Sequence, residues 1–121
     1  MLYTDRLFTV NTLSANLNGG ELIQLANDDK ASTAATQVQF TITNAQTVYV
    51  AYDPTTTPAP SWLSTWTKDT ASVFQWTGVA GGVATFDVYK KAFAAGSTVS
   101  LPGNLNGTTG AAHSNYTVIV H

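Results

Sequence analysis

Apolar and polar residues alternate at every second position through much of this chain, which is the period of a β-strand with one buried face. The clearest alternation runs through residues 38–43, 48–53, 85–89 and 115–120. Shorter strands are expected at residues 3–10, 21–25, 72–77 and 97–101. No segment keeps a helical period, and residues 22–27 would form a single turn at most. The pattern predicts an all-β fold, an antiparallel β-sandwich of two sheets, and leaves jelly-roll and immunoglobulin-like strand orders open.

Turn residues separate these strands. Gly, Pro and Asn gather at residues 18–20, 80–82 and 102–107. The Pro- and Thr-rich stretch at residues 54–60 has the composition of a linker. Strands on both sides of it are needed for one core, so we interpret it as a surface loop. With 121 residues, the chain fits a single β-sandwich domain, residues 1–121.

The surface is expected to be polar and nearly uncharged. Charged residues make up 10% of the chain and the net charge is -2, while the apolar fraction of 44% is normal for a folded domain. Without a basic stripe, nucleic acid and an acidic membrane surface are poor partners. Cysteine is absent, which excludes disulfides and thiolate metal sites. No apolar run is long enough to span a bilayer, and residues 1–10 do not resemble a signal peptide.

Three tryptophans lie close together in a chain that is otherwise rich in Thr and Asn. An indole ring must either pack in a core or remain outside for a partner with a flat apolar face. Trp62, in the run PSWL, is expected to be a packed corner residue. Trp66 lies among polar residues, and core and surface positions are equally open for it. Trp76 shares a strand face with Phe74 and is expected at the rim of the sandwich, available as a platform.

Neutral polar residues near these aromatic rings indicate sugar binding. A pyranose has an apolar C–H face and a rim of hydroxyls, so its site needs an aromatic plane beside amides, hydroxyls or carboxylates. Tyr52 and Tyr116 alternate with valines and should be core residues, whereas Tyr49 and Tyr89 point the other way and would extend the platform. For Tyr49 and Tyr89, the alternative is ordinary cross-strand pairing. For each polar candidate, the alternative is an ordinary solvated side chain. The candidate carbohydrate-binding residues are Trp66, Trp76, Tyr49, Tyr89, Gln75, Lys68, Asp69 and Asp87.

Catalytic and metal sites are not expected. Glycoside hydrolysis needs two carboxyl groups across a cleft, and the adjacent Asp28 and Asp29 would point apart on a strand. His113 lies in a Gly, Ala and Ser loop and is interpreted as a surface histidine. The segment around Asp29 offers oxygens to calcium, but we favour a charge cluster of Asp5, Arg6, Asp29 and Lys30. We therefore predict no catalytic residues, no metal and no cofactor.

Several short runs resemble a module appended to secreted bacterial polysaccharide-degrading enzymes. They are YTDR at 3–6, ANDD at 26–29, VYVAYD at 48–53, PSWL at 60–63 and AGSTVSLPGN at 95–104. The NYTVIV run near the end is similar to the last strand of that module, so the resemblance covers nearly the whole chain. The chain is also similar to carbohydrate-binding modules of family 81. That resemblance implies a β-sandwich with a rather flat β-glucan-binding surface, attached to an endoglucanase.

The sequence thus predicts a noncatalytic carbohydrate-binding module that binds β-linked glucan chains on an aromatic platform. We expect a secreted, monomeric domain, covalently linked to a glycoside hydrolase within a longer polypeptide that it targets to plant polysaccharide. The first alternative is a structural or adhesion β-sandwich domain without sugar affinity, in which the tryptophans serve packing. The second alternative is a small hydrolase.

Overall fold

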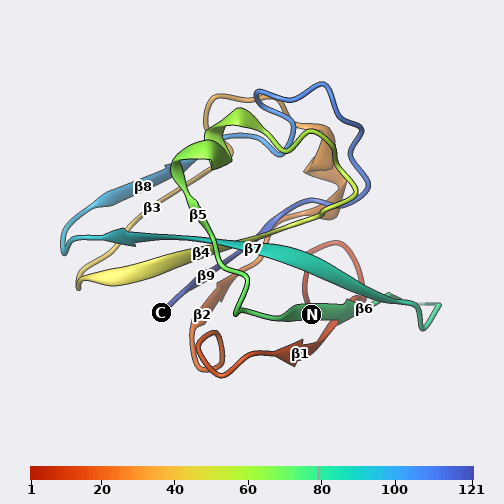
Figure 1. The fold of residues 1–121 in the computed structure, drawn as a ribbon, viewed down its shortest axis with the longest axis horizontal. Helices are drawn as coiled ribbons and strands as arrows, with labels where there is room; N and C mark the ends of the chain where they lie inside the picture. The colour runs from red at the N-terminus through yellow and green to blue at the C-terminus, as the bar shows by residue number, and fades with distance from the viewer. Residues whose placement is uncertain (79) are drawn as a thin grey trace.

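The computed structural model describes residues 1–78 and 80–121 and is built from antiparallel strands (Figure 1). The strands are β1 (Thr9–Leu13), β2 (Glu21–Ile23), β3 (Val38–Thr41), β4 (Gln46–Tyr52), β5 (Thr67–Lys68), β6 (Phe74–Thr77), β7 (Val83–Phe93), β8 (Thr98–Leu101) and β9 (Thr117–Val120). Two 3-10 helices, η1 (Asn27–Ala31) and η2 (Ser61–Thr65), interrupt them. The predicted all-β class is confirmed.

One large sheet and one small sheet make up the fold. The large sheet has the order β1-β6-β7-β4-β9-β2, with β5 added beside β7, and the small sheet pairs β3 with β8. Strand β7 runs across the molecule (Figure 1). Its first part pairs with β6 and its second part with β4. This strand therefore connects the two halves of the large sheet.

Both faces of the large sheet carry apolar side chains, because successive residues of a strand point to opposite faces. On β4, Val48, Val50 and Tyr52 belong to one buried cluster, to which β3, β8 and β9 also contribute. Ala51 belongs to the second buried cluster, together with Phe74 and Phe86. The first cluster lies between the two sheets, as in a sandwich, and the N-terminal residues Leu2 and Tyr3 help to cover the second. The large sheet thus has a core on each side.

The predicted strands lie where the alternation placed them, with one displacement. A strand was predicted at residues 3–10, but β1 spans Thr9–Leu13. Tyr3 is fully buried outside any strand, and its hydroxyl donates to the Asn115 carbonyl. Residues 22–27 do not form a helical turn, since Leu22 lies in β2 and the 3-10 turn begins only at Asn27. The apolar residues near the N-terminus therefore pack in the core and do not form one face of a strand.

Long loops gather at one end of the molecule, at the top of Figure 1. The loop after β4 is held in place: the Asp53 carboxylate accepts from the Thr55 amide at 2.9 Å, and the Thr56 hydroxyl donates to the Ala111 carbonyl at 3.0 Å. Asn104 is fully buried, and its side-chain amide donates to the Lys30 carbonyl at 2.8 Å. Residues 54–60 are thus tied to the loops around them.

The buried Asn115 links the N-terminal half of the chain to the last strand. Its side-chain amide donates to the Ala26 carbonyl at 2.8 Å, and its side-chain oxygen accepts from the Tyr116 amide at 3.0 Å. Its own backbone amide donates to the Asn27 side chain at 3.0 Å. Because buried polar groups must be paired, this residue satisfies several backbone groups that the sheet ladders do not reach.

Candidate functional site

Trp76 does not offer a platform, contrary to the sequence prediction. Its side chain is buried, with the residue only 9% exposed. Its ring stacks on Phe8, with centroids 4.7 Å apart, and meets Tyr3 and Phe86 edge to face. The chain before β1 folds back over this face, so the ring expected at the rim lies inside the second core. Trp76 is therefore a packing residue.

Tyr49 and Tyr89 do not share one surface. Tyr89 lies opposite Val50 across the β4–β7 ladder, and Tyr49 lies opposite Lys90. Directly paired residues point to the same face of a sheet, so the two rings point to opposite faces. Tyr49 packs against the second core and Tyr89 against the first, and both are partly buried. Tyr52 and Tyr116 are core residues as predicted, and their hydroxyls donate to backbone carbonyls.

Three of the predicted polar residues, Lys68, Asp87 and Gln75, are paired within the protein. Lys68 forms an ion pair with Asp87 at 2.9 Å, and this bond raises the pKa of the lysine. Gln75 donates to the Thr85 hydroxyl at 3.0 Å. Gln75 is next to Trp76 in the strand and so points away from it. These residues keep polar surface, but each is already paired with a neighbouring side chain.

Asp69 closes the turn between β5 and β6. The residue is 9% exposed, its carboxylate accepts from the Ser72 hydroxyl at 2.6 Å and from the Ala71 amide at 3.2 Å, and Lys90 lies 3.4 Å away. The Ser72 hydrogen bond, followed by the Ala71 amide and Lys90, lowers the pKa of the carboxyl despite the opposing effect of desolvation. The residue therefore has a structural role here.

Replacing Asp69 with Asn should remove a pH-dependent part of the stability. A carboxyl with a lowered folded pKa stabilises the fold above its unfolded value, and this contribution is lost as the pH falls through the folded value. We expect Asp69→Asn to be less stable than the wild type from about pH 5 to 7, with the difference shrinking below about pH 4. Urea unfolding of both proteins across this range measures it. A difference that stays constant with pH would contradict the assigned ionic role.

Trp66 is the predicted platform residue that retains a suitable position. It follows η2, is partly buried, and packs edge to face against Trp62 at 6.3 Å between ring centroids. Phe93 of β7 lies 6.0 Å from it at a tilt of 54°, and the Lys91 ammonium lies 6.0 Å from the indole centroid. Sequence analysis missed Phe93 and Lys91, although they share the two-residue period of Tyr89. We call Trp66, Phe93 and Lys91 the Trp66 surface.

Trp62 supports this surface from below. It is partly buried and packs against the first core, meeting Tyr116 at 5.5 Å between centroids. Its indole nitrogen donates to the Gly103 carbonyl at 3.3 Å. The predicted packing role of Trp62 agrees with these contacts. Because Trp62 is itself held by the core residue Tyr116 and by the Gly103 carbonyl, its contact with Trp66 restricts the orientation of the Trp66 ring.

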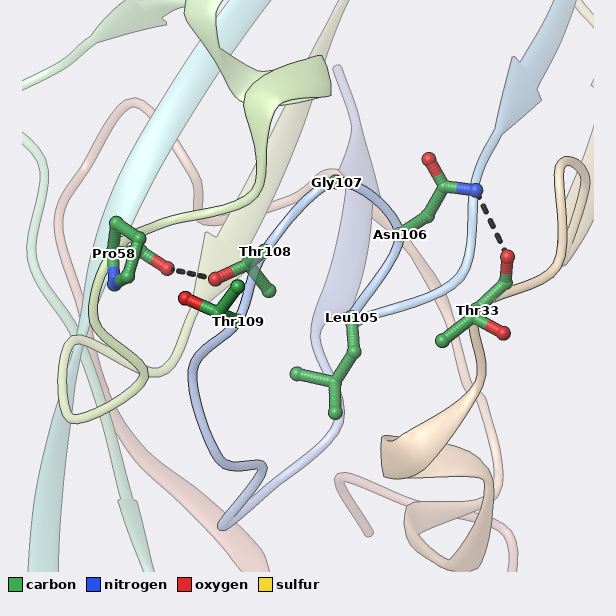
Figure 2. Close-up of a pocket in the computed structure, with 7 residues that line it drawn as sticks. All are labelled: Thr33, Pro58, Leu105, Asn106, Gly107, Thr108 and Thr109. Atoms are coloured by element: carbon green, nitrogen blue, oxygen red, sulfur yellow. Dashed lines mark hydrogen bonds between the residues drawn. The ribbon is translucent and has the colours of Figure 1, made fainter.

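A separate groove of about 500 Å³ lies among the long loops. Its walls come from three segments, as Figure 2 shows: residue 33 after η1, residue 58 before η2, and residues 105–109 after β8. Leu105 and Pro58 supply apolar surface, and threonines and Asn106 supply polar groups. None of the predicted site residues lines this groove. The only indication in the sequence was the run of turn residues that begins at Pro102.

The charge cluster near the N-terminus has a different membership from the prediction. Arg6 pairs with Asp28 and lies 3.4 Å from Asp5, whose carboxylate accepts from the backbone amides of Asn27 and Asp28. Asp29 and Lys30 form no ion pair within residues 1–78 and 80–121. His113 is exposed, as predicted. In the described part of the chain, no three His, Asp or Glu side chains come together to hold a metal ion.

These features define an all-β domain that carries the partly exposed Trp66 surface and, apart from it, the loop groove. No helix in the described residues has the length and apolarity of a membrane span.

The chain is similar to part of a solved beta-glucuronidase from glycoside hydrolase family 2, with a TM-score of 0.83 and 27% sequence identity. The match covers 98% of this chain and 12% of that chain, so the chain spans a small fraction of that enzyme's length. No family model matches the chain, and no curated protein matches it. Membership of carbohydrate-binding family 81 stays a prediction. A β domain of this size and fold does occur within a glycoside hydrolase.

Proposed function

We propose that this chain is a noncatalytic carbohydrate-binding domain that binds β-linked glucan chains at the Trp66 surface. The observation that carries the proposal is the fixed, partly exposed indole of Trp66, supported by Trp62 and flanked by Phe93. An aromatic plane held in place before the ligand arrives loses little side-chain entropy on stacking. The likeness to a segment of a glycoside hydrolase supports a role beside a catalytic domain in a longer polypeptide. We further propose that this polypeptide is secreted.

The proposal of a noncatalytic domain is supported by where the carboxylates lie. Five of the seven acidic residues are engaged within the protein: Asp5, Asp28, Asp53, Asp69 and Asp87. The other two, Glu21 and Asp29, lie on β2 and η1. Neither Glu21 nor Asp29 lines the loop groove. Hydrolysis of a glycosidic bond needs two carboxyl groups facing each other across the substrate, and we propose that the carboxyl groups of this chain do not act as such a pair.

Replacing Trp66 with Ala should weaken glucan binding by about 1 to 3 kcal/mol, or roughly 5- to 150-fold, because the stacking plane is lost. Isothermal titration with cellohexaose measures the change. Trp66→Phe keeps a smaller plane and should retain part of the affinity. Tyr49→Ala removes a partly buried aromatic ring from the opposite face and serves as the control with unchanged affinity.

Circular dichroism of each variant separates loss of binding from loss of fold. Equal affinity in wild type and Trp66→Ala would refute the Trp66 surface as the binding site. If the wild type itself bound none of a panel of β-glucans, the alternative of a structural domain without sugar affinity would replace the proposal.

A further inference from the structure

The loop groove shares no residue with the Trp66 surface. It lies among loops from three parts of the chain, at the end of the molecule where these loops gather (Figure 1). Its volume of about 500 Å³ falls within the range of small-molecule sites, about 300 to 1,000 Å³. The groove is therefore a candidate binding site separate from the Trp66 surface.

The walls of the groove are held by hydrogen bonds between the loops. Asn106 donates from its side chain to the Thr33 carbonyl at 2.9 Å, and the Thr108 hydroxyl donates to the Pro58 carbonyl (Figure 2). The Ser61 amide donates to the Gly107 carbonyl at 3.0 Å. Gly107 has φ of +80°, and a Cβ atom there would lie 2.1 Å from the Ser61 hydroxyl. The loop approaches η2 closely because this residue is glycine, and the groove exists before any ligand arrives.

Several polar groups on the groove remain available for a ligand. The side-chain hydroxyls of Thr33 and Thr109 are on exposed residues and form no hydrogen bond within the described residues. The side-chain oxygen of Asn106 is likewise unused there, since only its nitrogen is engaged. Two hydroxyls can donate or accept and the amide oxygen accepts, which suits a ligand whose own groups do both.

The remaining lining sets the charge and shape of the ligand. Among the described residues, no charged side chain lines the groove, so an ion would gain no partner on losing its water. Leu105 and Pro58 place apolar surface beside the free hydroxyls. A neutral pyranose combines an apolar face with a rim of hydroxyls and needs no charged partner. Flat aromatic ligands would cover the hydroxyls without offering them a hydrogen-bond partner.

We propose that this groove is a second, independent binding site that takes one neutral pyranose ring. Leu105 and Pro58 contact the apolar face of the ring. Thr33, Thr109 and the Asn106 side-chain oxygen bind its hydroxyls. Because the groove is open on one side and has no aromatic plane, affinity for a single ring is in the millimolar range.

The test is a titration of the isotope-labelled protein in which NMR measures the chemical shifts of the backbone amides. The probes are the methyl β-pyranosides of glucose, xylose and galactose, with methyl β-glucuronide as the charged counterpart. At least one neutral probe should shift the amides of residues 105–109. The glucuronide should bind more weakly than the neutral glucoside. Binding of the glucuronide as tight as that of the glucoside would overturn the assignment of a neutral ligand.

Variants at exposed positions test the groove without disturbing the core. Thr109→Trp fills the groove and should weaken binding at least tenfold, while Thr70→Trp, an exposed threonine elsewhere, should leave it unchanged. The double variant Thr33→Ala, Thr109→Ala removes two hydroxyls and should cost roughly fivefold or more. Two results would refute the site. One is the lack of any shift at residues 105–109 with every neutral probe up to about 100 mM, and the other is binding by Thr109→Trp as tight as that of the wild type.

Trp66→Ala distinguishes this proposal from the proposed function. It should leave the groove shifts intact while weakening cellohexaose binding at the Trp66 surface. Groove shifts that disappear in Trp66→Ala, although the variant remains folded, would contradict the independence of the two sites.

Discussion

Trp76→Ala is expected to lower the free energy of unfolding by about 3 to 5 kcal/mol, because it empties a large volume inside the second core. The ring is in contact with Phe8, Tyr3 and Phe86, and none of them can fill the space without leaving its own packing. For a domain of this size, such a loss is a large share of the total stability. Urea unfolding followed by circular dichroism measures it directly.

Trp76→Phe is the matched control. It keeps an aromatic ring and removes an indole N–H that is buried without a hydrogen-bond partner in the described residues. The loss should be well below that of Trp76→Ala, because part of the cavity remains filled and a costly unpaired donor is removed. A Trp76→Ala variant as stable as the wild type but impaired in sugar binding would restore Trp76 as a platform residue.

Asn115→Ala is expected to cost about 1 to 3 kcal/mol, since it leaves the buried Tyr116 amide unpaired and removes one of the two hydrogen bonds to the Ala26 carbonyl, which keeps the bond from the Asp29 amide. Each unsatisfied group costs about 1 to 3 kcal/mol when water cannot replace the lost partner. The same urea unfolding experiment measures the effect. The fold should persist, but the turn before η1 and the start of β9 should exchange their amide hydrogens faster.

Asn16→Ala provides the comparison for Asn115→Ala. Asn16 donates to the Ser72 hydroxyl at 2.6 Å, but this bond is exposed and water can replace it. We expect a change of at most about 0.5 kcal/mol. Equal effects of the two variants would show that burial of Asn115 is not what makes its hydrogen bonds important.

The strands were predictable because their signal is local. Alternation over a few residues is set by one buried face, and it located β3, β4, β8 and β9 closely. The displaced strand near the N-terminus shows the limit of this signal. Leu2 and Tyr3 are apolar because they cover the second face of the large sheet, and a sequence pattern does not distinguish such covering residues from a strand. The second core explains why β7 and β4 carry apolar residues on both faces.

The surface residues were less predictable, because their positions depend on strand register. Whether Tyr49 and Tyr89 share a face follows from which residue of β7 lies opposite Val50, and this pairing is a long-range property. The burial of Trp76 depends on a segment that precedes β1. Trp66 was left open between core and surface because its neighbours in sequence are polar, and its position depends on Trp62 and Phe93. The groove itself could not be predicted, since it is formed between three loops and the turn residues from Pro102 indicate only one of them.

The most direct test of the proposed function is a titration of the protein with cellohexaose. NMR records the indole N–H signals of Trp62, Trp66 and Trp76 at each step. Each tryptophan gives one signal, so the three positions are compared in a single sample. We expect the Trp66 signal to shift progressively to saturation, a smaller shift for Trp62, and no shift for the buried Trp76. Saturable binding of cellohexaose with an unchanged Trp66 signal would contradict the proposal that this surface binds β-linked glucan.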